Sequence, residues 1–207
     1  MIIKGVLPMT NQLILASSSP RRVALLKSAG YTFTQRTRPV DEEFQANKSA
    51  AENAVSLAKK KAFVFQEDMS IDEVILSADT VIALDGEPIG KPKEAGDAVD
   101  MLSRLSKTPH QVITGVALAT TDSVITFHSE TKVTFYPLTD EQIDMYVRTG
   151  EPLDKAGGYG INGLAALFIK EIVGDYYNVV GLPLSRLRQE LEHVNIYPDW
   201  LNSNMKR

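Results

Sequence analysis

The chain has 207 residues, of which 43% are hydrophobic and 23% charged, the composition of a globular protein large enough to bury a substantial core. Its net charge of −4 argues against non-specific binding to nucleic acid, and the lack of cysteine excludes disulfides, thiolate catalysis and cysteine-bound zinc. The three histidines, His110, His128 and His193, lie far apart in the sequence, which argues against a histidine-bound metal and a Ser-His-Asp triad.

The chain begins with a segment that lacks the plan of a signal peptide, and no apolar run approaches the length of a membrane span. We therefore expect a cytoplasmic protein that does not associate with membranes. Residues 1–12 are interpreted as an N-terminal extension, in which Met9 is an alternative natural start. Residues 13–207 contain no repeat or linker and are interpreted as one domain.

A short strand followed directly by a helix is predicted near the start. Leu13–Ala16 is an apolar run that predicts the strand, and Ser17–Ser19 interrupt it. Ser19 is then the N-cap of the helix, Pro20 its first residue and Gly30 its end. The free N–H groups of such a helix N-terminus favour an anion, and the guanidinium groups of Arg21 and Arg22 suit phosphate oxygens. Alternatively, this is an ordinary strand–helix corner with two solvated arginines.

Residues 31–36 alternate in character and predict a second strand, after which an acidic cluster that includes Glu42 follows. Taken alone, this cluster is typical of a solvated loop. Ser49 and Glu52 form a capping box that opens a helix reaching about residue 66. Lys61 falls on the apolar stripe of this helix, so its ammonium either extends to water or points into a cleft.

The strongest strand pattern is the nearly continuous apolar run Val74–Leu84, which predicts an inner strand covered on both faces. Asp79 interrupts this run. A buried carboxylate is costly unless it is paired, so Asp79 is either tied to backbone amides at a bulge or part of a functional site, and we favour the second interpretation. The pair Asp85-Gly86 predicts a turn, and Lys91 in the following loop is a candidate phosphate ligand.

The second half of the chain predicts a helix over 98–105, strands at 111–119, 124–128 and 131–136, and a helix that starts at the capping box of Thr139 and Gln142. Residues 151–163 have neither helical nor strand periodicity and contain four glycines within seven residues. This segment is either a flexible surface loop or a ligand loop that carries Asp154 and Lys155, and we favour the ligand loop. A last helix is predicted from 183 to about 191.

Most of these charged side chains lie at strand ends or in the following loops, where α/β sheets place ligand clefts. Cations combined with carboxylates, without a nucleophilic cysteine, fit metal-assisted chemistry on a phosphate chain: carboxylates hold Mg²⁺ or Mn²⁺, lysine and arginine neutralise phosphates, and one carboxylate activates water.

Six motifs stand out along the chain: Leu15–Arg22, Ala78–Val81, Gly90–Pro92, His110–Val116, Asp154–Ile161 and Val180–Pro183. In this order they resemble the Maf family of nucleoside triphosphate pyrophosphatases, and the resemblance covers nearly the whole chain from Leu13. The resemblance implies an α/β, ITPase-like fold, with an elongated mixed β-sheet flanked by helices and two lobes around a central cleft. It also implies a homodimer, and hydrolysis of a nucleoside triphosphate between its α and β phosphates with a divalent cation.

The resemblance also implies roles for individual residues. Asp79 would be the proton acceptor for the attacking water, and Arg21, Thr80 and Asn162 would set substrate choice. Thr80 matches the dTTP/UTP branch, whereas the branch that acts on 7-methyl-GTP carries glutamine there. Asn162 departs from the glutamine usual in the dTTP/UTP branch: it keeps the amide but is one methylene shorter. The phosphate-binding positions would be Ser17, Arg21, Arg22, Lys61, Lys91 and Lys155, and the metal-binding positions Glu42, Asp79 and Asp154.

We therefore expect a metal-dependent pyrophosphatase that acts on dTTP and UTP, with modified pyrimidine nucleotides as further substrates. Two alternatives stay open: the same chemistry on a modified purine such as 7-methyl-GTP, and a nucleotide-binding regulator of septum formation without significant turnover.

Overall fold

The computed structural model describes residues 11–201, and within this range the chain forms one mixed sheet of seven strands. The strands follow the order β2-β1-β3-β5-β6-β7, and β4 pairs with β3 outside this path. β1 runs parallel to β2 and β3, and the remaining pairs are antiparallel. The predicted elongated mixed sheet is thus confirmed. The strands are β1 (Gln12–Ala16), β2 (Thr34–Arg36), β3 (Glu73–Leu84), β4 (Glu87–Ile89), β5 (His110–Ala119), β6 (Val124–Phe135) and β7 (Ile169–Val173).

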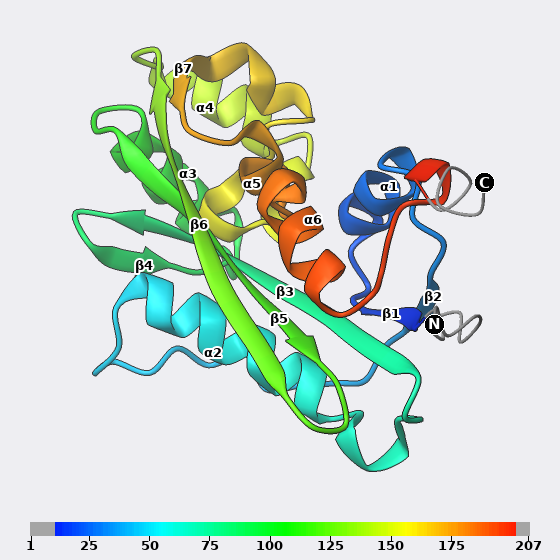
Figure 1. The fold of residues 1–207 in the computed structure, drawn as a ribbon. Coiled ribbons are helices and arrows are strands. Elements are labelled where there is room, and N and C mark those ends of the chain that lie inside the picture. The colour runs from blue at the N-terminus through cyan, green and yellow to red at the C-terminus, as the bar shows by residue number, and fades with distance from the viewer. Residues whose placement is uncertain (1–10, 202–207) are drawn as a thin grey trace, which may run out of the picture.

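Helices cover both faces of this sheet (Figure 1). α2 lies along β3 and β5 on one face, while α1 and α6 pack their apolar side chains on the opposite face, against β1 and β3. A further apolar cluster joins α3 and α4 to the distal ends of β3, β5 and β6. The helices are α1 (Pro20–Ser28), α2 (Ala50–Phe63), α3 (Ala95–Leu105), α4 (Asp140–Val147), α5 (Tyr176–Val180) and α6 (Leu184–His193), with short 3₁₀ segments at Gln66–Asp68, Glu151–Asp154, Ala156–Gly158 and Leu164–Phe168.

The central strand β3 has a different partner at each end of one edge. β1 pairs with residues 73–76 and β4 with residues 82–84, so no strand in the described part of the chain pairs with residues 77–81 on that edge. On the other edge β5 pairs with residues 75–83 throughout. The sheet therefore has an opening beside Asp79 and Thr80, and side chains from both faces of the sheet can reach it.

The local signals of the sequence produce the expected elements. Ser19 caps α1 and Pro20 is its first residue, and both capping boxes, at Ser49 and at Thr139, are formed. β3 is buried along nearly its whole length, as expected for an inner strand. At the predicted turn Asp85 and Gly86 adopt φ angles of 53° and 87°, which suit a tight hairpin between β3 and β4.

Several boundaries differ from the prediction: β2 begins at Thr34 instead of residue 31, and α3 begins at Ala95 instead of residue 98. β6 is one strand over Val124–Phe135 instead of two, because its pairing with β5 continues through His128, Ser129 and Glu130 without interruption. α2 ends at Phe63, and a short 3₁₀ segment follows. β1 begins at Gln12, so the proposed extension overlaps the sheet by one residue, and its residues 1–10 lie outside the described range.

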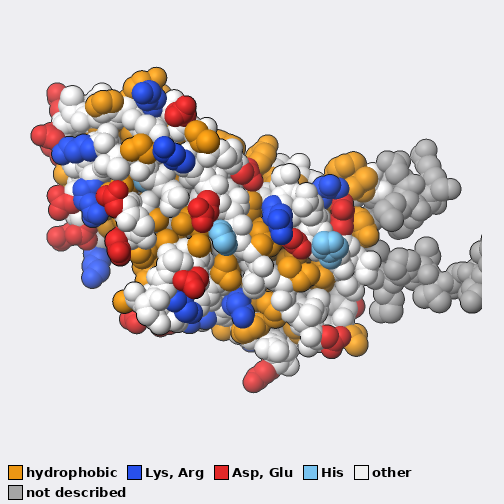
Figure 2. Space-filling model, turned by 60° about the vertical axis from the view of Figure 1, so that its left-hand side comes forward, with side chains coloured by type: hydrophobic (Ala, Val, Ile, Leu, Met, Phe, Trp, Pro, Cys, Tyr) orange, Lys and Arg blue, Asp and Glu red, His pale blue; other side chains and the backbone are white. Residues whose placement is uncertain are grey.

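On the face shown in Figure 2, positive and negative side chains are interspersed and do not gather into one extended basic patch. Within residues 11–201, no helix combines the length and apolar character that a membrane crossing requires.

Candidate active site

A cleft of about 550 Å³ lies at the opening of the sheet beside β3. All of the residues for which the sequence predicts a site role line it, although they come from seven separate segments of the chain. These residues are Ser17, Arg21, Arg22, Glu42, Lys61, Asp79, Thr80, Lys91, Asp154, Lys155 and Asn162. The opening accounts for this gathering, because neighbouring residues of a strand point to opposite faces and the cleft reaches both.

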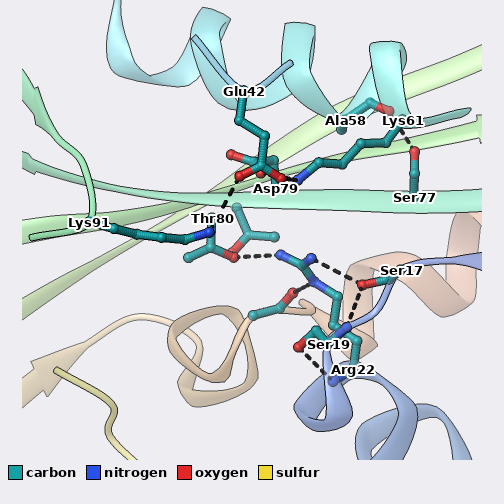
Figure 3. Close-up of polar contacts among 12 residues, drawn as sticks. Ser17, Ser19, Arg22, Glu42, Ala58, Lys61, Ser77, Asp79, Thr80 and Lys91 are labelled. Carbon is teal, nitrogen blue, oxygen red and sulfur yellow. Dashed lines mark hydrogen bonds and ion pairs between the residues drawn. The ribbon is translucent and has the colours of Figure 1, made fainter. Parts of the chain in front are cut away.

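On the face covered by α2, two carboxylates converge on one ammonium group (Figure 3). Lys61 Nζ lies 2.6 Å from Asp79 Oδ1 and 2.6 Å from Glu42 Oε1. One turn earlier in α2, the carbonyl of Ala58 accepts a hydrogen bond of 2.6 Å from Ser77 Oγ, which fixes the helix on β3. The apolar stripe of α2 thus points Lys61 into the cleft, the second of the two alternatives left by the sequence.

Glu42 lies between two lysines. Besides Lys61, Lys91 Nζ approaches Glu42 Oε2 at 3.4 Å. Burial alone would raise the pKa of Glu42, but the hydrogen bond and charge of Lys61, together with Lys91, outweigh burial and lower it. The acidic segment after β2 is exposed, as a solvated loop would be, but its Glu42 side chain also lines the cleft.

On the other face, Arg22 is buried and its guanidinium is bound within the protein. Its Nε donates to Gly181 O at 2.8 Å, its Nη2 to Thr80 Oγ1 at 3.0 Å and its Nη1 to Ser17 Oγ at 3.4 Å. Burial lowers the pKa of Arg22, and the nearby Asp79 charge opposes this effect. The idea of two solvated arginines at this corner was thus wrong for Arg22, which joins α1 to β3 and to the end of α5.

The glycine-rich segment closes the cleft at the far end of β3. Lys155 Nζ donates to Asp154 Oδ1 at 2.7 Å and to Glu151 O at 2.8 Å, and its hydrogen bond and charge lower the pKa of Asp154. The N–H of Gly157 donates to Gly90 O at 2.9 Å, which ties this segment to the loop that carries Lys91. The segment is therefore a wall of the cleft, and its role as a ligand loop stays a prediction.

A profile of the family described as "Maf-like protein" matches residues 12–194. The chain belongs to the Maf family. It is 47% identical over 188 residues to a protein named dTTP/UTP pyrophosphatase from Bacillus pumilus (strain SAFR-032), covering 91% of this chain and 99% of that protein. It is 46% identical to a protein of the same name from Bacillus cereus (strain AH820), covering 89% and 96%. The structure of the Staphylococcus aureus Ham1 protein is similar with a TM-score of 0.43 and 16% identity, over 74% of this chain and 77% of that one.

In the Maf cleft the side chains that could hold a hard divalent cation are Glu42 and Asp79, whose carboxylates both contact Lys61 Nζ. Mg²⁺ is usually held by one or two carboxylates, with substrate phosphates and water completing its ligands. Within the described residues, no three acidic or histidine side chains form a cluster that could hold a metal by themselves. Asp154 therefore does not join the other two carboxylates in such a group, and its oxygen Oδ1 binds Lys155 instead.

Two contacts of residues that line the Maf cleft were not predicted from the sequence. Arg38 lines the cleft, with its guanidinium 4.8 Å from the centre of the Phe65 ring. Tyr159, another lining residue, bonds through its hydroxyl to His110 Nε2 at 2.7 Å, and both rings pack edge-on against Phe135. Burial lowers the pKa of His110 to about 4. No periodicity signals these contacts, because each joins residues from distant segments.

Proposed function

We propose that this Maf protein is a nucleoside triphosphate pyrophosphatase that hydrolyses dTTP and UTP to the monophosphate and pyrophosphate. The observation that carries the proposal is the triad of Asp79, Lys61 and Glu42 in a cleft lined by further cations. Its relatives named dTTP/UTP pyrophosphatase, at 46–47% identity over nearly their whole length, support the same activity.

In this proposal Asp79 accepts a proton from the attacking water. The water oxygen forms a bond to the α-phosphorus, the bond from that phosphorus to the bridging oxygen breaks, and pyrophosphate leaves with the electron pair. Lys61 donates to Asp79 at 2.6 Å, which holds the carboxylate that would take the proton in place at the edge of the cleft. The mechanism thus places the base at the opening of the sheet, where both water and substrate can enter.

The remaining cations of the cleft are assigned to the phosphate chain. Arg21 at the start of α1, Lys91 after β4 and Lys155 in the glycine-rich segment line the same cleft. Their charges would offset the negative charge that develops on the leaving pyrophosphate. For Arg22, which was expected to bind phosphate directly, we propose a supporting role: its guanidinium is bound to three protein groups and would hold Ser17 in place.

Glu42 and Asp79 would hold a divalent cation, Mg²⁺ or Mn²⁺. Such a cation supplies Lewis-acid polarisation of phosphoryl oxygens and lowers the pKa of bound water. Glu42 lines the cleft at the end nearer Lys91, so it would keep that cation beside the phosphate-binding lysines. We keep Asp154, which lines the same cleft apart from the Glu42 and Asp79 pair, as a third proposed metal-binding position.

Substrate choice is assigned to Arg21, Thr80 and Asn162. Asn162 lines the cleft with the same amide group as the glutamine usual in the dTTP/UTP branch, and an amide can pair with the edge of a pyrimidine. The shorter side chain would leave more room at this point. We therefore propose dTTP and UTP as substrates, with modified pyrimidine nucleotides as an extension.

Further proposals concern the organisation of the protein. We propose that residues 13–207 form one catalytic domain, that the protein works in the cytoplasm, and that it forms a homodimer. Exposed apolar side chains near β7, such as Leu164, Leu167 and Val173, support a protein contact there. Sedimentation equilibrium over a range of protein concentrations tests the dimer, and a monomer at all concentrations would contradict it.

The test of the activity is pyrophosphate release from dTTP, UTP, CTP, dATP, GTP and 7-methyl-GTP, each with Mg²⁺ or Mn²⁺. Preference for dTTP and UTP is the expected result. Preference for 7-methyl-GTP would keep the reaction and overturn the substrate assignment. Absence of turnover with all of these nucleotides would contradict the enzymatic proposal and favour a nucleotide-binding regulator.

A further inference from the structure

A chain of hydrogen bonds runs from the cleft to the buried side of α5. Thr80 Oγ1 lies 3.0 Å from Thr114 Oγ1 on the neighbouring strand β5, and Thr114 Oγ1 lies 2.9 Å from the carbonyl oxygen of Asn178. Arg22 closes a ring, because it binds Thr80 at one end and Gly181, which follows α5, at the other. Thr114 and Asn178 are completely buried, so water cannot replace these contacts.

The chemistry of the partners fixes the direction of every proton in this chain. A carbonyl oxygen only accepts, so Thr114 must give its single hydroxyl proton to Asn178. Thr114 Oγ1 can then only accept in its contact with Thr80, so the Thr80 hydroxyl donates its proton to Thr114 Oγ1. Arg22 only donates, so Thr80 Oγ1 accepts from Nη2. Thr80 is left with one lone pair and no proton.

Asn178 is itself held in one orientation. Its Oδ1 accepts from the N–H of Thr114 at 3.2 Å, and its Nδ2 donates to Val112 O at 2.8 Å and to Thr131 Oγ1 at 2.9 Å. A flipped amide would place Nδ2 against an N–H and Oδ1 against a carbonyl oxygen, so the flip is strongly disfavoured. The backbone of α5 is therefore fixed relative to β5, and its carbonyl stays in place to take the Thr114 proton.

The remaining lone pair of Thr80 faces the cleft, because Arg22 and Thr114 occupy the two buried directions and the side chain lines the cleft. Phosphate oxygens of a nucleotide are acceptors, so they cannot hydrogen-bond to this oxygen. An N–H or O–H donor of the nucleoside can. The imide N–H of uracil and thymine is such a donor, whereas cytosine has an acceptor nitrogen at the same ring position.

We propose that Thr114 and Asn178 are positioning residues that hold Thr80 as an obligate hydrogen-bond acceptor, so that the cleft selects a nucleotide with a donor at this point. This inference rests on the proposed function and adds to it a physical basis for preferring uracil and thymine over cytosine. The donor has two sources, the imide of the base and the 2′-hydroxyl of ribose, and the substrates of the test separate them.

The test compares Thr114→Val with Thr114→Ser in the full chain. Valine has nearly the shape of threonine but cannot accept the Thr80 proton, so the Thr80 hydroxyl turns its proton to the cleft. A donor then faces the imide N–H, and we expect the ratio of kcat/KM for UTP to that for CTP to fall by about tenfold or more. Thr114→Ser keeps the hydroxyl and restores the ratio.

The comparison of UTP with dUTP identifies the source of the donor. If Thr114→Val changes the UTP:CTP ratio of kcat/KM but not the UTP:dUTP ratio, the donor is the imide of the base. If it changes the UTP:dUTP ratio but not the UTP:CTP ratio, the donor is the ribose hydroxyl. A merely structural role for Thr114 would lower kcat/KM equally for all three nucleotides, and that result would overturn the inference. If Thr114→Val does not fold by circular dichroism, Thr80→Val gives the same comparison, with UTP losing about tenfold more than CTP.

The inference and the proposed function fail in different ways. Absence of UTP and dTTP turnover by the unaltered enzyme would contradict the proposed function. Normal turnover of UTP with unaltered nucleotide ratios in a folded Thr114→Val protein would contradict only the assignment of Thr80 as a fixed acceptor.

Discussion

Lys61 Nζ donates a hydrogen bond of 2.6 Å to Asp79 Oδ1, and the two side chains are 16% and 12% exposed. A carboxylate this enclosed is costly without a partner. α2 supplies that partner because its apolar stripe packs on β3 and brings Lys61 over the strand. The same lysine binds Glu42 from the loop after β2. One ammonium group thus joins three segments at the opening of the sheet.

Asp79→Asn is expected to lower kcat for dTTP by at least about 100-fold, because the amide keeps the shape of the side chain but cannot accept a proton. Folding is expected to be retained. The measurement is pyrophosphate release, with circular dichroism as the check on folding. Asp122→Asn, an exposed change in the turn between β5 and β6, is the matched control. Unaltered turnover by Asp79→Asn would disprove the proposed proton acceptor.

Lys61→Met is expected to reduce activity by about 100-fold or more, since Asp79 and Glu42 would then face each other without the positive charge between them. Lys60→Met is the matched control: the neighbouring lysine of α2 lines a groove away from the cleft, with Phe63 and His128. Steady-state rates with dTTP compare the two variants. Equal activities would show that the Lys61 contact is structural only.

Structural features that depend only on residues close together in the sequence could be predicted from it. The Ser19 cap, the Ser49 and Thr139 capping boxes and the Asp85-Gly86 turn depend on neighbouring side chains, and all are present. That the site residues lie together in one cleft could be expected only from the resemblance of the six motifs, in their order, to the Maf family. Their roles in binding and catalysis remain predictions.

Contacts across the sheet could not be predicted in the same way. The burial of Arg22 depends on Gly181, 159 residues later in the chain, and the pairing of His110 with Tyr159 depends on how the glycine-rich segment folds back. The division of β6 into two strands was wrong, because pairing with β5 supplies hydrogen bonds along the whole segment and holds it extended.

Gly115→Ala is expected to destabilise the protein by about 3 kcal/mol or more, because a Cβ there would lie 2.3 Å from the backbone carbon of Ala54 and force α2 away from β5. Activity is expected to fall as well, since α2 carries Lys61. Urea unfolding and dTTP turnover measure the two effects. Gly86→Ala is a useful comparison, as a Cβ there meets nothing within 4 Å and only the backbone φ of 87° opposes it. Equal stabilities of the Gly115→Ala and unaltered proteins would contradict the close approach of α2.

The buried His110 is expected to make stability depend on pH. Burial lowers its pKa from 6.5 to about 4 in the folded protein, whereas the unfolded chain keeps the ordinary value. Between these values the unfolded state binds more protons, so the free energy of unfolding falls as the pH drops from about 6.5 towards 4. The expected loss from this group is about 2 kcal/mol between pH 7.5 and pH 5. Urea unfolding at the two pH values measures it.

His110→Gln isolates this contribution. Glutamine keeps a polar group near Tyr159 but does not titrate, so the variant is expected to be less stable at pH 7.5 and to lose about 2 kcal/mol less than the unaltered protein on going to pH 5. His193→Gln, a change of a histidine whose side chain is 70% exposed, provides the control and is expected to leave the loss unchanged. An identical pH dependence in the His110→Gln and unaltered proteins would show that His110 is not the group that titrates.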